Sequence, residues 1–253
     1  MSKSQMADPL TGVASPAAAR VEAQTHRQAL FRGRAILSLG LLLLVVFGVL
    51  TALVAGLKPE QFDLPITQQV QKLNTIPLLN SLLIAVSEPG FAPWAYVVPA
   101  LLALAWLVAR RVAEAVFLVV ATLGTAGSDV VKAVIHRARP TDALVHVVHN
   151  TNLDGSSFPS SHVVEYTLVF GFCFYLLATL LKPGIGRAGG LALCAAMIIA
   201  IGPSRIAMGQ HWASDVLGGY ALGFGLLLVV VWAYRGWETR LAARQAAQAA
   251  VRT

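Results

Sequence analysis

Long apolar blocks, separated by shorter polar segments, run through most of the chain. A helix needs roughly 20 consecutive apolar residues to cross a bilayer. Six blocks of that kind occur, at residues 35–56, 91–109, 112–131, 163–181, 188–208 and 216–234. The fifth block is apolar over only part of its length, so it crosses only if the helix continues through Ser204 and Arg205. The pattern predicts an all-α, polytopic membrane protein with six transmembrane helices.

The composition supports a membrane protein. Charged residues make up 12% of the 253-residue chain and hydrophobic residues 57%, whereas a soluble domain has about 25% charged residues. The first apolar block is long and starts 34 residues into the chain, which predicts an uncleaved span rather than a signal peptide. Residues 1–34 and 236–253 are rich in alanine and charge. We expect them to be cytosolic tails on either side of one six-span domain, residues 35–235.

Lys and Arg are distributed unevenly among the segments that join the apolar blocks. With both termini in the cytosol, 13 of the 19 Lys and Arg residues lie on the cytosolic side and six on the outer side. Positive residues favour the cytosolic side of a membrane, so the distribution predicts cytosolic N- and C-termini. The net charge of +7 then reflects orientation and attraction to acidic lipid. We therefore expect the lipid bilayer, and no nucleic acid, as a partner.

Three polar segments at span ends carry the residues of chemical interest. They read DVVKAVIHRARPTD, GSSFPSSHVVEY and SRIAMGQHWASD, and the predicted orientation places all three at the outer face. Lys132 and Arg139 are seven residues apart, so they share a helix face if the helix lasts two more turns. We expect Arg137 to be a snorkelling anchor. Seven side chains are expected at one level: Lys132, Arg139, Ser160, His162, Arg205, His211 and Asp215.

These residue types suit a dianion and a proton-transfer reaction. Arg matches phosphate oxygens with a planar fork and Lys adds a point charge, while the N-terminus of the helix after FPSSH can face the same anion. His211 and Asp215 are four residues apart, so they can touch on one helix face. A carboxylate on one imidazole nitrogen raises the basicity of the other, which makes His211 a candidate nucleophile. His162, on a different segment, is a candidate general acid.

The three segments resemble the signature of the type 2 phosphatidic acid phosphatase (PAP2) superfamily of membrane lipid phosphatases. That signature reads KxxxxxxRP, PSGH and SRxxxxxHxxxD, and this chain has KAVIHRARP, PSSH and SRIAMGQHWASD. The resemblance covers about residues 35 to 235 and implies an all-helical fold and phosphoester hydrolysis without a metal or other cofactor. It implies His211 as nucleophile, Asp215 as its partner and His162 as general acid. It implies phosphate binding by Lys132, Arg139, Ser160 and Arg205.

One position departs from the signature, because Ser161 stands where the family has glycine. Its N–H and hydroxyl can still contribute to phosphate binding, but a side chain here changes the anion cradle and the substrate fit. Two acids lie near the motifs. Asp129, one turn before Lys132, is expected to pair with a cation, and Glu165, one turn beyond His162, to support the site.

The resemblance implies an integral-membrane phosphatase that acts through a phosphohistidine intermediate on a polyprenyl diphosphate, phosphatidylglycerol phosphate or phosphatidic acid. Its expected place is the bacterial cytoplasmic membrane, with the active site on the periplasmic or extracellular face. Three other functions stay open: a phosphotransferase that uses the same phosphohistidine, a metal enzyme with ligands among the two histidines and Asp215, and a non-catalytic carrier. Three nearby cations disfavour the metal site. The motifs identify neither the lipid nor the oligomeric state.

Overall fold

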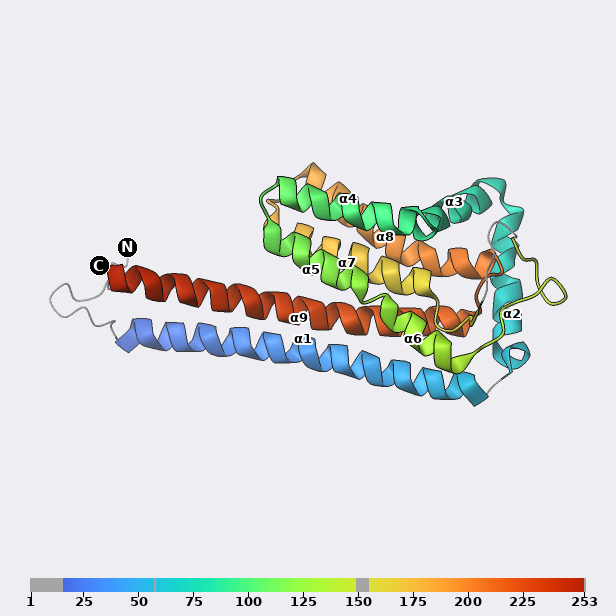
Figure 1. The fold of residues 1–253 in the computed structure, drawn as a ribbon, viewed down its shortest axis with the longest axis horizontal. Coiled ribbons are helices and arrows are strands. Elements are labelled where there is room, and N and C mark those ends of the chain that lie inside the picture. Colours follow the sequence, from blue (N-terminus) through green and yellow to red (C-terminus); the bar gives the residue numbers. More distant parts are fainter. Residues whose placement is uncertain (1–15, 57, 149–154, 253) are drawn as a thin grey trace.

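The computed structural model describes residues 16–56, 58–148 and 155–252, and Figure 1 shows their arrangement. These residues form helices joined by turns and loops, with no β-strand in the described part of the chain, so the prediction of an all-α protein is confirmed there. The α-helices are α1 (Pro16–Gly56), α2 (Pro59–Gln71), α3 (Pro77–Ser87), α4 (Trp94–Val108), α5 (Val112–Leu123), α6 (Ala126–Ile135), α7 (Ser161–Leu180), α8 (Ile185–Ala207) and α9 (Ala213–Arg252). Two short 3-10 helices are η1 (Lys72–Thr75) and η2 (Glu88–Gly90).

Five helical stretches among the described residues are long and apolar enough to cross a membrane. They are Phe31–Gly56, Val112–Ile135, Ser161–Leu180, Ile185–Ala207 and Ala213–Val251. The second stretch combines α5 and α6. Helix α4 has 15 residues and passes the same test only together with Pro77–Gly90, from which it is bent by 72°. The part of the chain that the structure describes therefore has five such stretches, and six if the bent pair crosses the bilayer as one unit.

Helices α1 and α9 are longer than a bilayer requires. They have 41 and 40 residues, they pack against each other, and they extend together beyond the other helices (Figure 1). A helix of 40 residues is about 60 Å long, twice the thickness of the hydrocarbon core. Residues 1–15 of the predicted N-terminal tail lie outside the described residues. The remainder of that tail is helical and continuous with the first span.

Helix α7 forms the centre of the bundle. It packs against α5, α8 and α9, and its side chains Leu168, Phe172 and Leu176 are fully buried. A helix that is surrounded by neighbours carries apolar residues on all its faces, and α7 has this pattern. Packing in the bundle therefore fixes the start of α7, and with it the motif residues at the N-terminus of this helix.

Helices α2 and α3 cover the end of the bundle opposite the extension of α1 and α9 (Figure 1). The hydroxyl of Ser204, on α8, donates a hydrogen bond of 2.5 Å to the carbonyl of Leu83, on α3. The hydroxyl of Tyr166, on α7, donates one of 2.6 Å to the carbonyl of Val86. These bonds fix α3 against the ends of α7 and α8, where two of the three polar motifs lie.

Candidate active site

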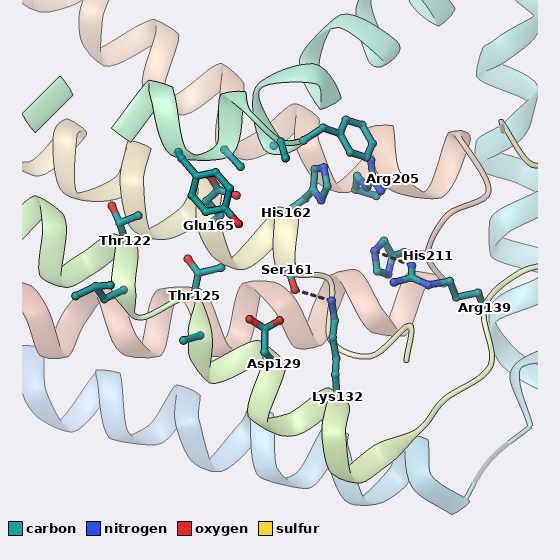
Figure 2. A pocket seen from close by; sticks show the side chains of 17 residues that line it. Thr122, Thr125, Asp129, Lys132, Arg139, Ser161, His162, Glu165, Arg205 and His211 are labelled. Atoms are coloured by element: carbon teal, nitrogen blue, oxygen red, sulfur yellow. Dashed lines mark hydrogen bonds between the residues drawn. The ribbon is translucent and has the colours of Figure 1, made fainter. Parts of the chain in front are cut away.

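A cavity of about 490 Å³ lies at the capped end of the bundle and collects residues from all three motifs. Its lining comes from α6 and the segment after it, the start of α7, the end of α8, the loop before α9 and the η2–α4 bend (Figure 2). Six of the expected site residues line it: Lys132, Arg139, Ser161, His162, Arg205 and His211. Ser160 and Asp215, which were expected beside them, are not part of its lining.

Arg205 brings a charge into the buried wall of the cavity. Its side chain is on the last turn of α8 and is 0% exposed. Nη1 donates to the hydroxyl of Ser87 at 3.1 Å, and the guanidinium lies over the ring of Phe91, 4.9 Å from its centroid. Nε and Nη2 have no hydrogen-bond partner among the described residues. A buried guanidinium with unpaired N–H groups is costly unless an anion accepts hydrogen bonds from them. This wall of the cavity is therefore suited to bind an anion.

Lys132 and Ser161 meet on the opposite side of the cavity (Figure 2). The ammonium of Lys132 donates to the hydroxyl of Ser161 at 2.6 Å, and that hydroxyl lies 2.7 Å from the hydroxyl of Ser128. The serine that replaces the family glycine is therefore in direct contact with a cation of the first motif. Asp129 was expected to pair with a cation, but it has no ion-pair or hydrogen-bond partner in the part of the chain that the structure describes.

Arg139 reaches the cavity by a route that the sequence did not predict. Helix α6 ends at Ile135, and His136 is left-handed, with φ of 47°, so Lys132 and Arg139 do not share a helix face. The segment after His136 instead carries Arg139 across the cavity to the loop before α9. There Nη1 donates to the carbonyl of Gln210 at 2.9 Å and lies 3.4 Å from Nε2 of His211.

The contacts of His211 fix its tautomer. Nδ1 lies 2.8 Å from the carbonyl oxygen of Ser157, which can only accept, so Nδ1 carries the proton. Nε2 then holds the lone pair, and its neighbour at 3.4 Å is the guanidinium of Arg139, which can only donate. Burial, and then the charges of Arg139, Arg205 and Lys132, lower the pKa of His211 well below its ordinary value. The ring is therefore neutral at neutral pH, with a nucleophilic nitrogen beside the cations.

Asp215 does not hold the ring of His211 in the expected way. The closest approach, from Nδ1 to Oδ2, is 3.6 Å, which is too long for a hydrogen bond. Oδ2 instead accepts the backbone N–H of Trp212 at 2.8 Å. The i, i+4 argument assumed one helix, but α9 begins at Ala213, so His211 is in the loop before it. The Ser157 carbonyl orients the ring, while Asp215 contributes a nearby negative charge.

Arg137 is not a snorkelling anchor, and that expectation is wrong. Its side chain is buried, with the residue only 8% exposed, between two carboxylates. Nη1 donates to Asp215, and Nη2 donates to Oδ2 of Asp63 at 2.6 Å. Asp63, on α2, also accepts from the backbone N–H and the hydroxyl of Ser214, at 2.8 and 2.9 Å. This ion triad of Asp63, Arg137 and Asp215 joins the cap to the start of α9.

His162 is positioned by packing. Neither ring nitrogen makes a hydrogen bond to another described residue, and Nε2 is buried without a partner. The ring meets Phe91 edge to face, with centroids 4.6 Å apart. A Cβ atom on Gly90 would lie 2.2 Å from Cδ2 of this ring, so the bend at η2 needs glycine for the close approach.

Ser160 stands at the N-cap of α7 and is not among the residues that line the cavity. It is fully buried, and its backbone N–H donates to the carbonyl of Asp215 at 3.1 Å. The N–H is therefore already used in the protein. The residue of the PSSH segment that presents its side chain to the cavity beside His162 is Ser161.

This architecture is that of a helical membrane protein with a buried, cation-lined cavity that holds two histidines. The family model of the PAP2 superfamily matches residues 112–239, and the chain belongs to this superfamily. Phosphatidylglycerophosphatase B of Bacillus subtilis (strain 168) is 34% identical to it over 105 residues. That match covers 41% of this chain and 49% of the relative, so the chain spans about half the length of the curated relative it matches.

A solved structure shares the fold. It is the crystal structure of a transmembrane PAP2-type phosphatidylglycerolphosphate phosphatase from Bacillus subtilis, with a TM-score of 0.62 and 21% sequence identity. The superposition covers 79% of this chain and 96% of the other. At this identity the likeness shows that the helices are arranged in the same way.

Proposed function

We propose that the chain is a lipid phosphate phosphatase that works through a phosphohistidine on His211. The substrates that fit the family are a polyprenyl diphosphate, phosphatidylglycerol phosphate and phosphatidic acid. The observation that carries the proposal is the position of the Nε2 lone pair of His211 in a cavity lined by Arg139, Arg205 and Lys132. A nucleophile beside three cations suits a substrate with a doubly charged phosphate.

The phosphate is bound by charge and by unused donors. Nε and Nη2 of Arg205 supply a fork for two phosphate oxygens, and Arg139 and Lys132 supply charge from the other sides. The hydroxyl of Ser161, which lies between Lys132 and the cavity, contributes a further polar contact. The same cations stabilise the charge that the equatorial oxygens carry in the transition state.

The first chemical step transfers the phosphoryl group to the enzyme. Nε2 of His211 attacks phosphorus, a P–N bond forms, and the bond from phosphorus to the lipid oxygen breaks. His162 donates a proton to the departing oxygen, which leaves as an alcohol or a lipid monophosphate. The Ser157 carbonyl and the charge of Asp215 stabilise the positive charge that develops on the ring of His211.

The second step releases phosphate. Water attacks phosphorus, the P–N bond breaks, and the deprotonated His162 takes a proton from the water. A lipid or sugar hydroxyl in place of that water gives phosphotransfer with the same residues. The two reactions are separated by product analysis with an added alcohol.

The site is placed on the outer face of a bacterial cytoplasmic membrane, with six spans and both termini inside. Arg110, Arg111, Lys182 and Arg187 are at or near helix ends away from the motifs, and this supports the orientation. A cysteine at the exposed position Ala143 is expected to react with an impermeant reagent in intact cells, and one at Lys182 only after permeabilisation. The reverse pattern would invert the topology. The two native cysteines are buried and serve as an unreactive background.

The test of function uses the purified chain in detergent. Released phosphate is measured with all three lipid substrates, and rapid quenching with labelled substrate is expected to trap an acid-labile phosphohistidine that is absent in His211→Ala. No phosphate release from any of them, or a phosphoenzyme that survives in His211→Ala, would overturn the proposal. Full activity with a chelator is expected, and among the described residues no group of three His, Cys, Asp or Glu side chains is arranged to hold a metal ion.

A further inference from the structure

The cavity is much larger than a phosphate group, and its two ends differ in chemistry. Figure 2 shows Arg139, Arg205 and the two histidines toward one end and Glu165, Thr122 and Thr125 toward the other, with Asp129 and Lys132 side by side below. Asp129 precedes Lys132 by three residues on α6, and Glu165 follows His162 by three residues on α7. These two helices run in opposite directions through the bundle, so both acids are one turn, about 5 Å, further from the capped end than the phosphate-binding residues.

Neither Asp129 nor Glu165 forms a side-chain pair with another described residue, although the negative charge of Asp129 attracts the nearby ammonium of Lys132. No described residue makes a hydrogen bond or ion pair with the carboxylate of Asp129 or Glu165. Glu165 is half-buried on a membrane-spanning helix, where an ionisable group is costly and usually serves a function. It does not orient His162, whose ring makes no hydrogen bond, and Asp129 does not pair with Lys132. The two carboxylates therefore face the space that a substrate would fill.

A lipid substrate must pass this acidic layer. With its terminal phosphate at the cations, the group next to the scissile ester falls in the part of the cavity whose lining includes Asp129 and Glu165, one helical turn from the phosphate-binding residues. Carboxylates accept hydrogen bonds from hydroxyl and ammonium groups. They repel a second phosphate at close range.

We infer that Glu165 and Asp129 determine substrate specificity, and that the site selects phosphate monoesters with a hydroxyl or ammonium group beside the scissile ester. A lipid diphosphate is disfavoured, because its second phosphate would lie in the acidic layer. This inference rests on the proposed function and narrows its substrate class.

The experiment measures kcat/KM for three substrates. Phosphatidylglycerol phosphate has a hydroxyl beside the scissile ester, phosphatidic acid has no such donor, and a polyprenyl diphosphate has a second phosphate there. The wild type is expected to prefer the first. Glu165→Gln and Asp129→Asn are each expected to lower the ratio of phosphatidylglycerol phosphate to diphosphate kcat/KM on the order of tenfold, mainly because diphosphate turnover rises. The control Glu238→Gln removes a half-buried carboxylate on α9 that lies outside the cavity lining, and it is expected to leave the ratio unchanged.

Two results overturn the inference. One is a wild type that prefers the diphosphate, and the other is a Glu165→Gln, Asp129→Asn double variant with an unchanged ratio. Phosphate release from none of the three substrates would instead reject the proposed function, so the two failures are distinct. If the variants do not fold, soluble inhibitors of the wild type provide the same test. Glycerol 3-phosphate is expected to compete better than propyl phosphate, and inorganic diphosphate worse than both; the opposite order contradicts the inference.

Discussion

The two histidines of the cavity are held in contrasting ways. His211 is fixed by polar contacts, since Nδ1 donates to a carbonyl and Nε2 faces a guanidinium. His162 is packed against Gly90 and Phe91, and its ring nitrogens make no hydrogen bond to a described residue. A nucleophile needs a lone pair at a fixed place, and polar contacts select that tautomer. A general acid must gain and lose a proton, and a ring held by packing keeps its position in both states.

The largest effect expected from this contrast is the loss of the nucleophile. His211→Ala removes the ring nitrogen whose lone pair faces Arg139 in the cavity, so no turnover is expected on any phosphoester. The assay is phosphate release from both an alkyl phosphate and a nitrophenyl phosphate. The matched control is His146→Ala, at an exposed position outside the cavity lining, with activity like the wild type. Activity of His211→Ala on any ester would remove its assigned role.

The loss of the acid should depend on the leaving group. His162→Ala is expected to lower kcat/KM by roughly 10²- to 10⁴-fold on an alkyl phosphate, the range of one general acid. The loss on a nitrophenyl ester should be much smaller, because nitrophenolate leaves as a stable anion. If hydrolysis of the phosphohistidine limits turnover, rapid quenching will show accumulated intermediate. Equal losses on both esters without that accumulation would contradict the division of roles.

A smaller change tests whether packing alone positions His162. Gly90→Ala places a Cβ atom 2.2 Å from Cδ2 of the ring, so the ring must move. We expect kcat/KM on an alkyl phosphate to fall about tenfold, which corresponds to about 1.4 kcal/mol of transition-state stabilisation, with little change on a nitrophenyl ester. Gly189→Ala is the control, because a Cβ atom there meets nothing within 4 Å. An unchanged rate in Gly90→Ala would show that contact with Gly90 does not set the ring position.

The smallest effect concerns protonation of His211 without any change in sequence. Its pKa is lowered by burial and by Arg139, Arg205 and Lys132, so the ring should stay neutral at pH 6, below the ordinary histidine value of about 6.5. Because the folded-state pKa is depressed, its contribution to stability is present above about pH 6.5 and is lost as pH falls toward the folded-state value. Nitrogen chemical shifts of labelled histidine, assigned with His211→Gln, measure this directly. A doubly protonated His211 at pH 6 would contradict the assigned tautomer.

The sequence predicted the helices well because a bilayer imposes a length on every span. The sequence did not predict the bend before Trp94, because apolar residues continue along the chain across it. The bend depends on tertiary packing, which the apolar pattern does not report. Within the site, residues at helix ends such as Lys132 and His162 lie where their motifs suggested. The site residues whose positions were predicted wrongly depend on loop geometry. The left-handed His136 ends α6 early and separates the directions of Arg137 and Arg139, and α9 starts after His211, so Asp215 approaches its ring only to 3.6 Å, without a direct hydrogen bond.

The interaction partners of Asp63 and Asp129 do not follow from local sequence spacing. Nothing local to Asp63 indicates a partner, because Arg137 is 74 residues away in the chain. Asp129 appeared to have a partner one turn away, yet Lys132 bonds to Ser161 instead. Charge pairs between distant segments depend on the fold, and a spacing rule applies only where a regular element joins the two residues.

The ion triad also has a consequence for biosynthesis. Asp63 and Ser214 are 151 residues apart, and at roughly 5–20 residues per second the ribosome needs about 8 to 30 seconds to make the chain between them. During that interval the carboxylate of Asp63 has no complete set of partners and stays hydrated. Helix α2 also packs against α8, but the ion triad that joins it to α9 is complete only after α9 has been made. A chain that stops before α9 leaves Asp63 and Arg137 without Asp215 and Ser214.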